Sequence, residues 1–293
     1  MPNLKKADFA IEAYDKKLDE VQVAQLTFFR ALWAEQNALR DELAPDYRAP
    51  ASDTIKKHAQ AQTPILRVFP AGIDAPRLAQ AGTRMAAALC REGGYPPEAC
   101  AQIEAIDWER VAKASACYAG SNPELCLETA YRALLGAGAD DAVAQLATSA
   151  LSLGLRALLE PAAEAIMKER EKAEVAMLHP LHCPVCGCGA TIASIGASSA
   201  GSGGARQLYC AQCGAVWDFD RIRCARCGTR NQGHLHYHHV GDDDAHRIHT
   251  CDECGGYIRT VFQEDIFAPI ALEVEDVVMA RLDQVAQKLV EGK

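Results

Sequence analysis

The chain of 293 residues is 49% hydrophobic and 24% charged, a composition typical of a globular protein with about two domains. Its formal net charge of −9 excludes the overall basic character of nucleic-acid-binding proteins, so we expect no nucleic-acid partner. The N-terminus has no apolar signal-peptide core, and charged residues interrupt the most apolar stretch, residues 146–167. We therefore expect a cytoplasmic protein without direct membrane insertion.

The N-terminal part of the chain reads as helical. From about Leu18 to Val175, apolar residues recur at helical spacing among good helix formers, and no alternating strand pattern competes. Asp74 and Asn122 stand just ahead of prolines, as residues at helix N-termini do. The pattern predicts an all-α helical domain over residues 1–178 with six or seven helices, including a buried, kinked helix through Pro161.

After His179 the sequence changes to cysteine pairs, glycines and short alternating runs. Thirteen cysteines without a secretory signal favour reduced, metal-binding thiols over disulfides. Four Cys-x-x-Cys-Gly units occur, and each predicts a knuckle, a tight turn in which two thiolates face one ion while the glycine adopts the conformation that closes the turn. The cysteine pairs are Cys183/Cys186, Cys210/Cys213, Cys224/Cys227 and Cys251/Cys254.

The spacing of the knuckles predicts how they pair. Twenty-three residues separate Cys186 from Cys210 and twenty-three again separate Cys227 from Cys251, whereas only ten lie between the two inner knuckles. Equal intervals describe one unit used twice, as in metal ribbons. We therefore predict two tetrathiolate sites, each holding one ion of iron or zinc, which the ligand set does not distinguish. The first site comprises Cys183, Cys186, Cys210 and Cys213, and the second comprises Cys224, Cys227, Cys251 and Cys254.

These elements together predict a fold of the α plus small β class. The helical domain is followed by tandem rubredoxin-like or zinc-ribbon modules over residues 179–219 and 220–265, and then by a C-terminal helix over residues 266–293. Between the inner knuckles, Trp217 and Phe219 alternate with aspartates, which predicts a strand with one packed face rather than a ligand loop.

The remaining cysteines and histidines are weaker candidates. Residues 234–249 hold six of the nine histidines, and we favour a solvated hairpin over a third metal site or a pH-sensitive contact. Cys188 follows the first knuckle and is interpreted as a bystander, with a replacement metal ligand or a redox-active thiol as the alternatives. Four further cysteines lack ligand spacing and are interpreted as small buried helix residues: Cys90, Cys100, Cys117 and Cys126.

The cysteine framework resembles that of the FdhE formate dehydrogenase accessory proteins. The resemblance lies in CPVCG at 183–187, in residues 206–210 leading into CAQCG, in residues 221–224 leading into CARCG, and in CDECG followed by Tyr257–Arg259. It implies a cytoplasmic protein needed to form active formate dehydrogenase. The implied partner is the molybdenum- or tungsten-dependent catalytic subunit, and the two rubredoxin-like sites of the family are associated with iron.

Three functional hypotheses follow. The first is a non-enzymatic assembly factor that binds the immature catalytic subunit through a metal-stabilised surface. It agrees with the lack of any phosphate loop, Gly-x-Ser-x-Gly or His-Glu-x-x-His motif in the sequence. The second is a rubredoxin-like electron-transfer protein that serves a redox enzyme. The third, a nucleic-acid-binding zinc ribbon, is disfavoured by the acidic charge of the chain.

Overall fold

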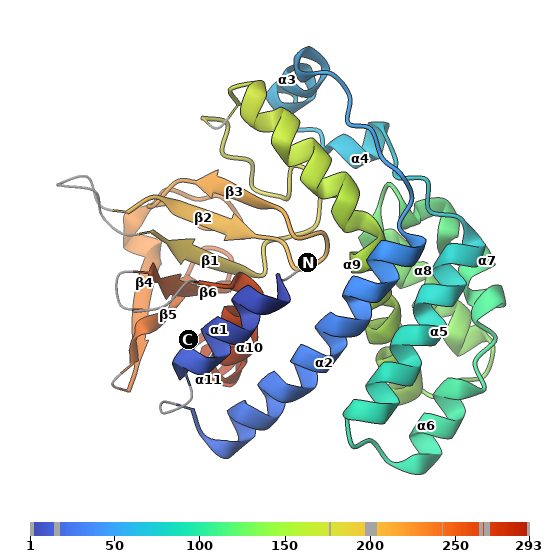
Figure 1. Ribbon diagram of the computed structural model, residues 1–293. Helices are drawn as coiled ribbons and strands as arrows, with labels where there is room; N and C mark the ends of the chain where they lie inside the picture. Colours follow the sequence, from blue (N-terminus) through green and yellow to red (C-terminus); the bar gives the residue numbers. More distant parts are fainter. Residues whose placement is uncertain are drawn as a thin grey trace.

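The first part of the chain is helical, as predicted. The structure, a computed structural model, describes residues 3–14, 18–175, 177–196, 204–241, 243–263, 266 and 270–291. Within these residues nine α-helices precede the first strand (Figure 1): α1 (Leu4–Tyr14), α2 (Glu20–Leu43), α3 (Ser52–Gln60), α4 (Ile65–Val68), α5 (Ala75–Glu92), α6 (Pro97–Glu104), α7 (Trp108–Ala119), α8 (Pro123–Gly136) and α9 (Asp141–Lys172). The expected number of six or seven is too low, because α1 precedes the stretch with the helical pattern and α4 has only four residues, too few to show a helical period.

Side-chain caps define several helix starts. The Asp74 carboxylate accepts a hydrogen bond from the Arg77 N–H at 2.9 Å, and the Asn122 side chain accepts one from the Leu125 N–H at 3.3 Å. Each cap satisfies a backbone donor that the helix itself leaves free. Both residues were singled out from the sequence, and both predictions are confirmed.

Helix α9 is the central helix of the bundle. It contacts α2, α5 and α8, and it continues as one helix through Pro161. By length and composition alone α9 is apolar enough to cross a membrane, but 61% of its most apolar window is buried inside the molecule. Its apolar surface is therefore accounted for by packing against the neighbouring helices, as in the core of a globular protein.

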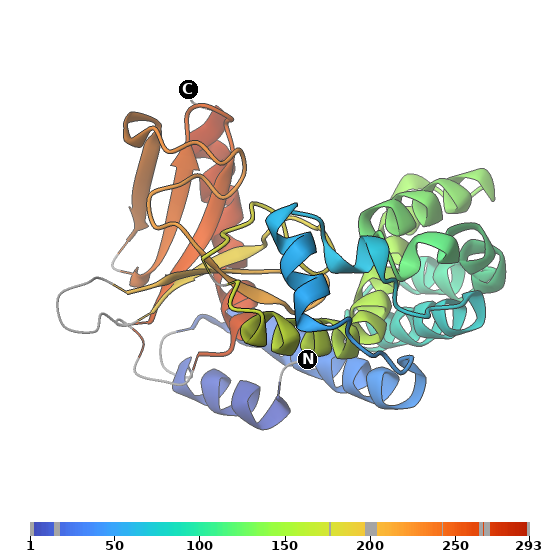
Figure 2. The ribbon, with the colours of Figure 1, turned by 90° about the horizontal axis from the view of Figure 1, so that it is seen from above.

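The strands form one continuous sheet. In the part of the chain that the structure describes, its six strands are β1 (Ile192–Ile195), β2 (Arg206–Tyr209), β3 (Val216–Phe219), β4 (Leu235–Val240), β5 (Asp243–Cys251) and β6 (Tyr257–Phe262), in the order β3-β2-β1-β6-β5-β4. Each predicted module contributes an antiparallel hairpin and one further strand, and the two halves join where β1 pairs in parallel with β6. The sheet stands beside the helical bundle (Figure 2). The two modules are thus parts of one body, while the domain limits at 178, 219 and 265 stay predictions.

The C-terminal region packs on the second half of the sheet. Instead of one helix, it forms α10 (Leu272–Val278) and α11 (Leu282–Glu291), separated by a 3-10 turn at Met279–Arg281. Met279, Leu282 and Ala286 are buried in one cluster with sheet residues such as Ile248 and Val261. On its other side α10 packs against α1 and α2, where Val274 and Trp33 share a second cluster. Helices from the two ends of the chain, α1 and α10, therefore pack against each other.

A buried ionic network links these two ends to the sheet. His246 of β5 lies 2.8 Å from the Asp243 carboxylate through Nδ1 and 3.0 Å from the Glu275 carboxylate of α10 through Nε2. Tyr14 of α1 donates to Glu275 at 2.8 Å, and Arg281 donates to Asp243 at 2.8 Å. Burial alone would lower the pKa of His246, but the hydrogen bonds to the two carboxylates outweigh it and raise the pKa to about 9.

The stability of the protein is therefore expected to fall in mild alkali. A histidine whose pKa is higher in the folded than in the unfolded state contributes stability that is complete below pH 6.5 and is lost as the pH rises through about 9. Urea unfolding at pH 6 and pH 9.5 should show a loss on the order of 2–3 kcal/mol. His246→Gln should flatten this dependence, and His239→Gln, at a half-exposed position, should keep it. If the free energy of unfolding of His246→Gln fell with pH as steeply as that of the unaltered protein, the loss could not be assigned to His246.

Candidate metal centres

All four Cys-x-x-Cys-Gly units adopt the same turn. The glycine N–H donates to the carbonyl of the first cysteine of each unit at 2.8–3.1 Å, as in Gly214 to Cys210 and Gly228 to Cys224. Each of these glycines has a positive φ, between 64° and 88°, where a side chain would be strained. The predicted knuckle is therefore confirmed as a local structure. The four glycines are Gly187, Gly214, Gly228 and Gly255.

The knuckles pair as the 23-residue intervals predict. The sulfurs of Cys183, Cys186, Cys210 and Cys213 form one group and those of Cys224, Cys227, Cys251 and Cys254 form the other, with the atoms of each group within 4.8 Å of one another. Sγ–Sγ distances are 3.5 and 3.6 Å across the first group and 3.8 Å twice across the second. Tetrahedral metal–sulfur bonds of about 2.3 Å place neighbouring sulfurs about 3.8 Å apart. Each group therefore fits one tetrahedrally bound ion such as zinc or iron.

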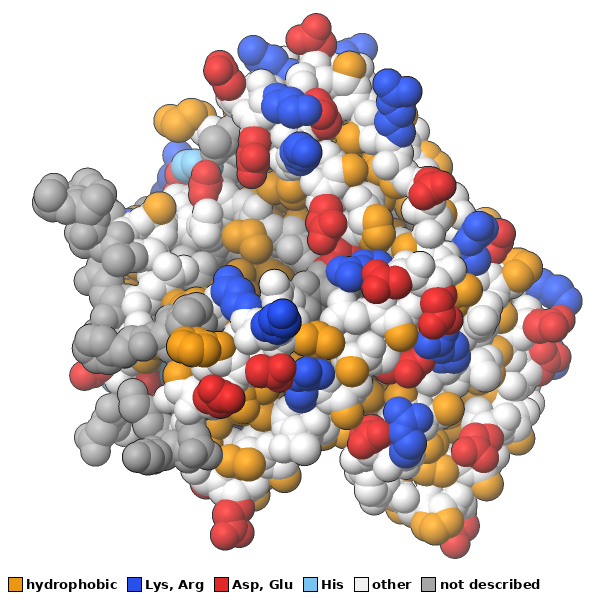
Figure 3. Space-filling model, viewed as in Figure 1, with side chains coloured by type: hydrophobic (Ala, Val, Ile, Leu, Met, Phe, Trp, Pro, Cys, Tyr) orange, Lys and Arg blue, Asp and Glu red, His pale blue; other side chains and the backbone are white. Residues whose placement is uncertain are grey.

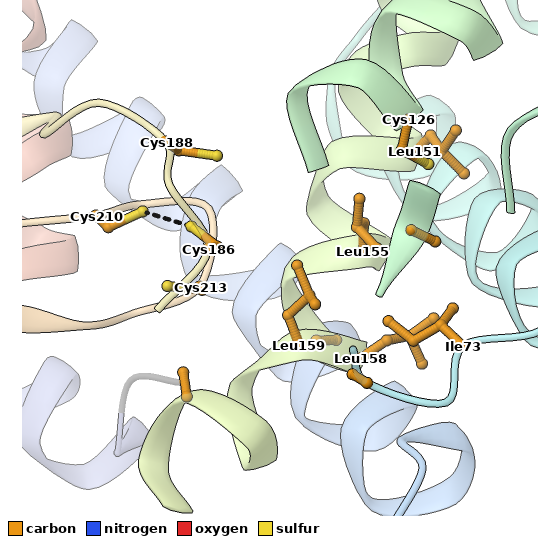
Figure 4. Close-up of a cluster of buried hydrophobic side chains, with 14 of the residues drawn as sticks. Ile73, Cys126, Leu151, Leu155, Leu158, Leu159, Cys186, Cys188, Cys210 and Cys213 are labelled. Atoms are coloured by element: carbon orange, nitrogen blue, oxygen red, sulfur yellow. Dashed lines mark hydrogen bonds between the residues drawn. The ribbon is translucent and has the colours of Figure 1, made fainter. Parts of the chain in front are cut away.

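The first group is part of the main hydrophobic core. All four of its cysteines are buried, and they belong to the same cluster as Leu155 and Leu159 of α9 (Figure 4). The first knuckle also caps the start of α4. The N–H groups of Ile65 and Leu66, the first two residues of that helix, each donate at 3.0 Å to a carbonyl between Cys183 and Cys186. This site thus joins the helical bundle to the sheet.

Arg156 of α9 holds the second knuckle of this site against the bundle. Its Nη1 donates to the Ala211 carbonyl, between Cys210 and Cys213, and to the Tyr209 hydroxyl at 3.0 Å. Its Nη2 pairs with Glu273 of α10 at 3.2 Å and with Glu160 at 3.5 Å. The guanidinium is buried, so these partners supply both its hydrogen bonds and its counter-charge.

The second group lies nearer the surface. Cys224 and Cys251 are buried, but Cys227 and Cys254 are exposed. Backbone N–H groups of Arg226 and Cys227 point at the Cys224 sulfur at 3.3 and 3.5 Å, as expected for a thiolate. Half of this tetrathiolate therefore faces solvent.

Three arginines surround the second group. Arg206 donates to the Arg223 carbonyl at 2.8 Å, and Arg226 donates to the Tyr257 and Ala190 carbonyls at 2.9 and 3.0 Å. Arg223 donates to the Gly228 carbonyl at 3.2 Å. Four thiolates around a divalent ion carry a charge of −2, which the guanidinium groups of Arg206 and Arg226, bonded to neutral carbonyls, are suited to balance. Arg223 also pairs with the Asp220 carboxylate at 3.4 Å. Arg206 and Arg226 also link the two halves of the sheet. Arg206 lies on β2 of the first half and bonds the Arg223 carbonyl of the second, and Arg226 bonds one carbonyl in each half.

The two sites are expected to release metal at different rates. A chelator reaches the second site through its exposed sulfurs but reaches the first only after the core opens. Metal release to a chromogenic chelator should be biphasic, with about one equivalent in each phase. Cys227→Ser should abolish the fast phase and keep the slow one. A single phase of two equivalents in the unaltered protein would contradict this difference.

The other residues singled out from the sequence divide into three groups. Trp217 and Phe219 are buried on β3, and the Trp217 indole donates to the Pro180 carbonyl at 2.9 Å, so the predicted strand with a packed face is confirmed. Cys188 is buried in the same core as the first group but lies outside its four sulfurs.

Of the four other cysteines, Cys126 is buried as predicted. The prediction is wrong for Cys117, which is exposed, and only partly right for Cys90 and Cys100, which are half-buried because they lie near helix surfaces.

The histidine-rich segment is the predicted hairpin, β4 and β5, and among the described residues it makes no third metal cluster. The prediction that it is solvated is wrong for His246 and His249, which are buried because β5 is an inner strand of the sheet. Residue 242, between β4 and β5 in this hairpin, lies outside the described residues. Arg156 was not identified from the sequence; its only signal was a charge within the most apolar stretch.

Comparison with known proteins gives a consistent result, although no protein-family model matches the chain. Protein FdhE of Escherichia coli O1:K1 is 34% identical over 86 residues, 28% of this chain and 26% of that protein, and Protein FdhE of Shigella boydii serotype 18 gives the same values. The chain thus matches about a quarter of the length of these curated relatives. The crystal structure of the FdhE protein from Pseudomonas aeruginosa matches 97% of this chain and 90% of its own, with a TM-score of 0.58 and 21% identity. The chain therefore has the fold of FdhE and local sequence similarity to FdhE proteins, which confirms its resemblance to the FdhE family.

Proposed function

We propose that the protein is an accessory factor for the formation of active formate dehydrogenase. In this proposal it acts in the cytoplasm, without catalytic activity of its own, and binds the immature catalytic subunit. The proposal follows from the resemblance to FdhE, which extends over nearly the whole fold and, in part, over the sequence. The eight cysteines of the two groups would hold two ions, iron or zinc, one in each group.

The observation that carries the proposal is the joining of both four-cysteine groups in one sheet. The parallel pairing of β1 with β6 holds the two halves in register, from Ile192 opposite Arg259 to Ile195 opposite Phe262. Arg226 bridges the same halves by bonding carbonyls of both. Two ions bound in such a unit would keep a constant separation, so the metals would support one preformed docking surface rather than two mobile fingers. Preformed surfaces lose less conformational entropy on binding.

A deletion strain tests this function. Loss of the gene should abolish formate dehydrogenase activity while the catalytic polypeptide is still made, and the intact gene should restore activity. Anaerobic affinity purification of the tagged protein should recover the catalytic subunit. Normal activity in the deletion strain would contradict the proposed function. Activity lost without any recovered subunit would instead contradict direct binding.

The exposure of the second group favours electron transfer as the second candidate. Cys227 and Cys254 face solvent, and a thiolate ligand at the surface offers a partner a short path to an iron ion. Protein purified without oxygen would then contain iron and show a visible spectrum that changes reversibly on reduction. A colourless protein loaded with zinc at both sites would exclude this candidate, since zinc has no redox chemistry.

A further inference from the structure

A small cavity lies where the last turn of α9 and the end of α3 meet the first knuckle. Its volume is about 60 Å³. Arg170 of α9 borders it together with Thr63 and Pro64, which precede α4, and with Pro180 and Cys183. Figure 1 shows α3 beside the end of α9, and the two helices contact each other. Of the described residues that line the cavity, none is an aspartate or a glutamate.

Arg170 is a buried cation without a bonded partner. The residue is only 6% exposed, yet no ion pair and no hydrogen bond joins its guanidinium group to any described residue. The other buried arginines in the described part of the chain, Arg156, Arg206 and Arg259, all donate to carboxylates or carbonyls. The Nε atoms of Arg156 and Arg206 are sealed from solvent, but the nitrogens of Arg170 are not. A group that enters the cavity can therefore reach them.

Two nearby features favour the positive charge of Arg170 without bonding to it. Arg170 lies in the last turn of α9, where the helix dipole favours a cation. Burial lowers the pKa of Arg170, and the negative charge of the Cys183 thiolate opposes this lowering. Neither feature accepts a hydrogen bond from the guanidinium group. A planar group with five donors thus borders the cavity unbonded, and the two oxygens of a carboxylate match its geometry.

The size of the cavity limits what it can hold. A cavity of about 150 Å³ holds a benzene molecule, so about 60 Å³ holds about three heavy atoms, the number in a carboxylate group. The rest of a ligand would extend outward past Leu178, which borders the cavity and is 37% exposed. Figure 3 shows basic and acidic side chains interspersed over α3 and the end of α9. Surface charge therefore does not select an anion here, and selection would depend on Arg170.

We propose that this cavity binds a carboxylate group, presented by an acidic side chain of a polypeptide or by a small free acid, with Arg170 as its bidentate donor. Bidentate pairs of arginine and carboxylate are among the strongest hydrogen-bonded contacts in proteins. Leu178 and Pro180 would contact the methylene groups that carry the carboxylate. The inference does not depend on the proposed function, because it concerns the purified chain and small ligands.

NMR titration of the metal-loaded, full-length protein tests the site through the arginine Nε–H signals. The signal of Arg170 is assigned by its absence from the spectrum of Arg170→Lys. Nα-acetyl-glutamate amide should shift this signal and saturate it with a dissociation constant on the order of 1–10 mM, a range suited to a single ionic contact. The neutral isostere Nα-acetyl-glutamine amide should leave it in place.

Propionate, which has the same carboxylate without peptide groups, distinguishes the two sources. Affinity for propionate at least equal to that for the glutamate compound indicates a free acid. Tighter binding of the glutamate compound indicates an acidic side chain of a polypeptide. No saturable shift of the Arg170 signal with either acid, or an equal shift with the glutamine compound, would overturn the proposal and leave Arg170 as a counter-charge for the thiolates alone.

Variants locate the binding, which ligand-observed NMR measures in each of them. Arg170→Met should weaken the glutamate compound at least about tenfold. Arg170→Lys keeps the positive charge beside Cys183 but lacks the planar fork, so it should keep both equivalents of metal and bind about three- to tenfold more weakly. The matched control is Lys168→Met, which removes an exposed cation of α9 and should leave the affinity unchanged. Metal analysis and the thermal midpoint identify the variants that are folded and loaded. Unchanged affinity in either folded Arg170 variant would show that Arg170 is not the bidentate donor.

Discussion

Replacing Cys186 with serine is expected to destabilise the whole protein, not only the sheet. Cys186 is fully buried and shares one hydrophobic cluster with residues of α5, α8 and α9. Structural zinc sites in small modules contribute on the order of 10–16 kcal/mol, comparable with the total stability of a domain. Loss of one ligand should therefore remove one equivalent of metal and lower the free energy of unfolding by more than about 3 kcal/mol.

The matched control is Cys227→Ser in the second group. This cysteine holds the same position in its knuckle but is exposed, so its loss should free one equivalent of metal with a smaller, local effect. Metal analysis together with thermal unfolding followed by circular dichroism at a helix-sensitive wavelength distinguishes the two. Equal shifts of the midpoint would mean that the burial of the first site does not couple it to the bundle.

Replacement of Arg156 with methionine is expected to have the second largest effect. The substitution keeps an unbranched side chain but removes the guanidinium group, which leaves Glu160, 2% exposed, without one of its cationic partners. It also removes the donors to Tyr209 and Ala211 and separates α9 from α10 at Glu273. Breaking a buried ion pair by removing one partner costs about 3–5 kcal/mol.

Denaturant unfolding measures this loss of stability, and two further variants identify its cause. Arg132→Met removes an exposed ion pair with Glu128 on α8 and should change stability by less than about 0.5 kcal/mol. The double replacement Arg156→Met and Glu160→Gln should recover part of the loss, because the stranded carboxylate is gone. A double variant that is no more stable than Arg156→Met would show that lost packing, not an unpaired charge, dominates.

Local features of this fold could be predicted residue by residue. The caps at Asp74 and Asn122, the four knuckles and the packed strand with Trp217 depend on residues within a few positions of one another. The pairing of the knuckles depends on a repeat that is visible in the spacing itself. Errors arose where an element was short, as with α4, or where strand order decided exposure, as with His246 and His249.

The sequence by itself thus determined the helical first part and which cysteines come together, because helical period, turn chemistry and ligand spacing are local properties. Only the tertiary structure decided that the two modules share a sheet, since Ile192 and Arg259 pair in parallel from distant positions of the chain. It also decided that one cysteine group is buried and the other half exposed, and that Arg156 joins three segments. These properties depend on long-range packing, which leaves no periodic signal in the chain.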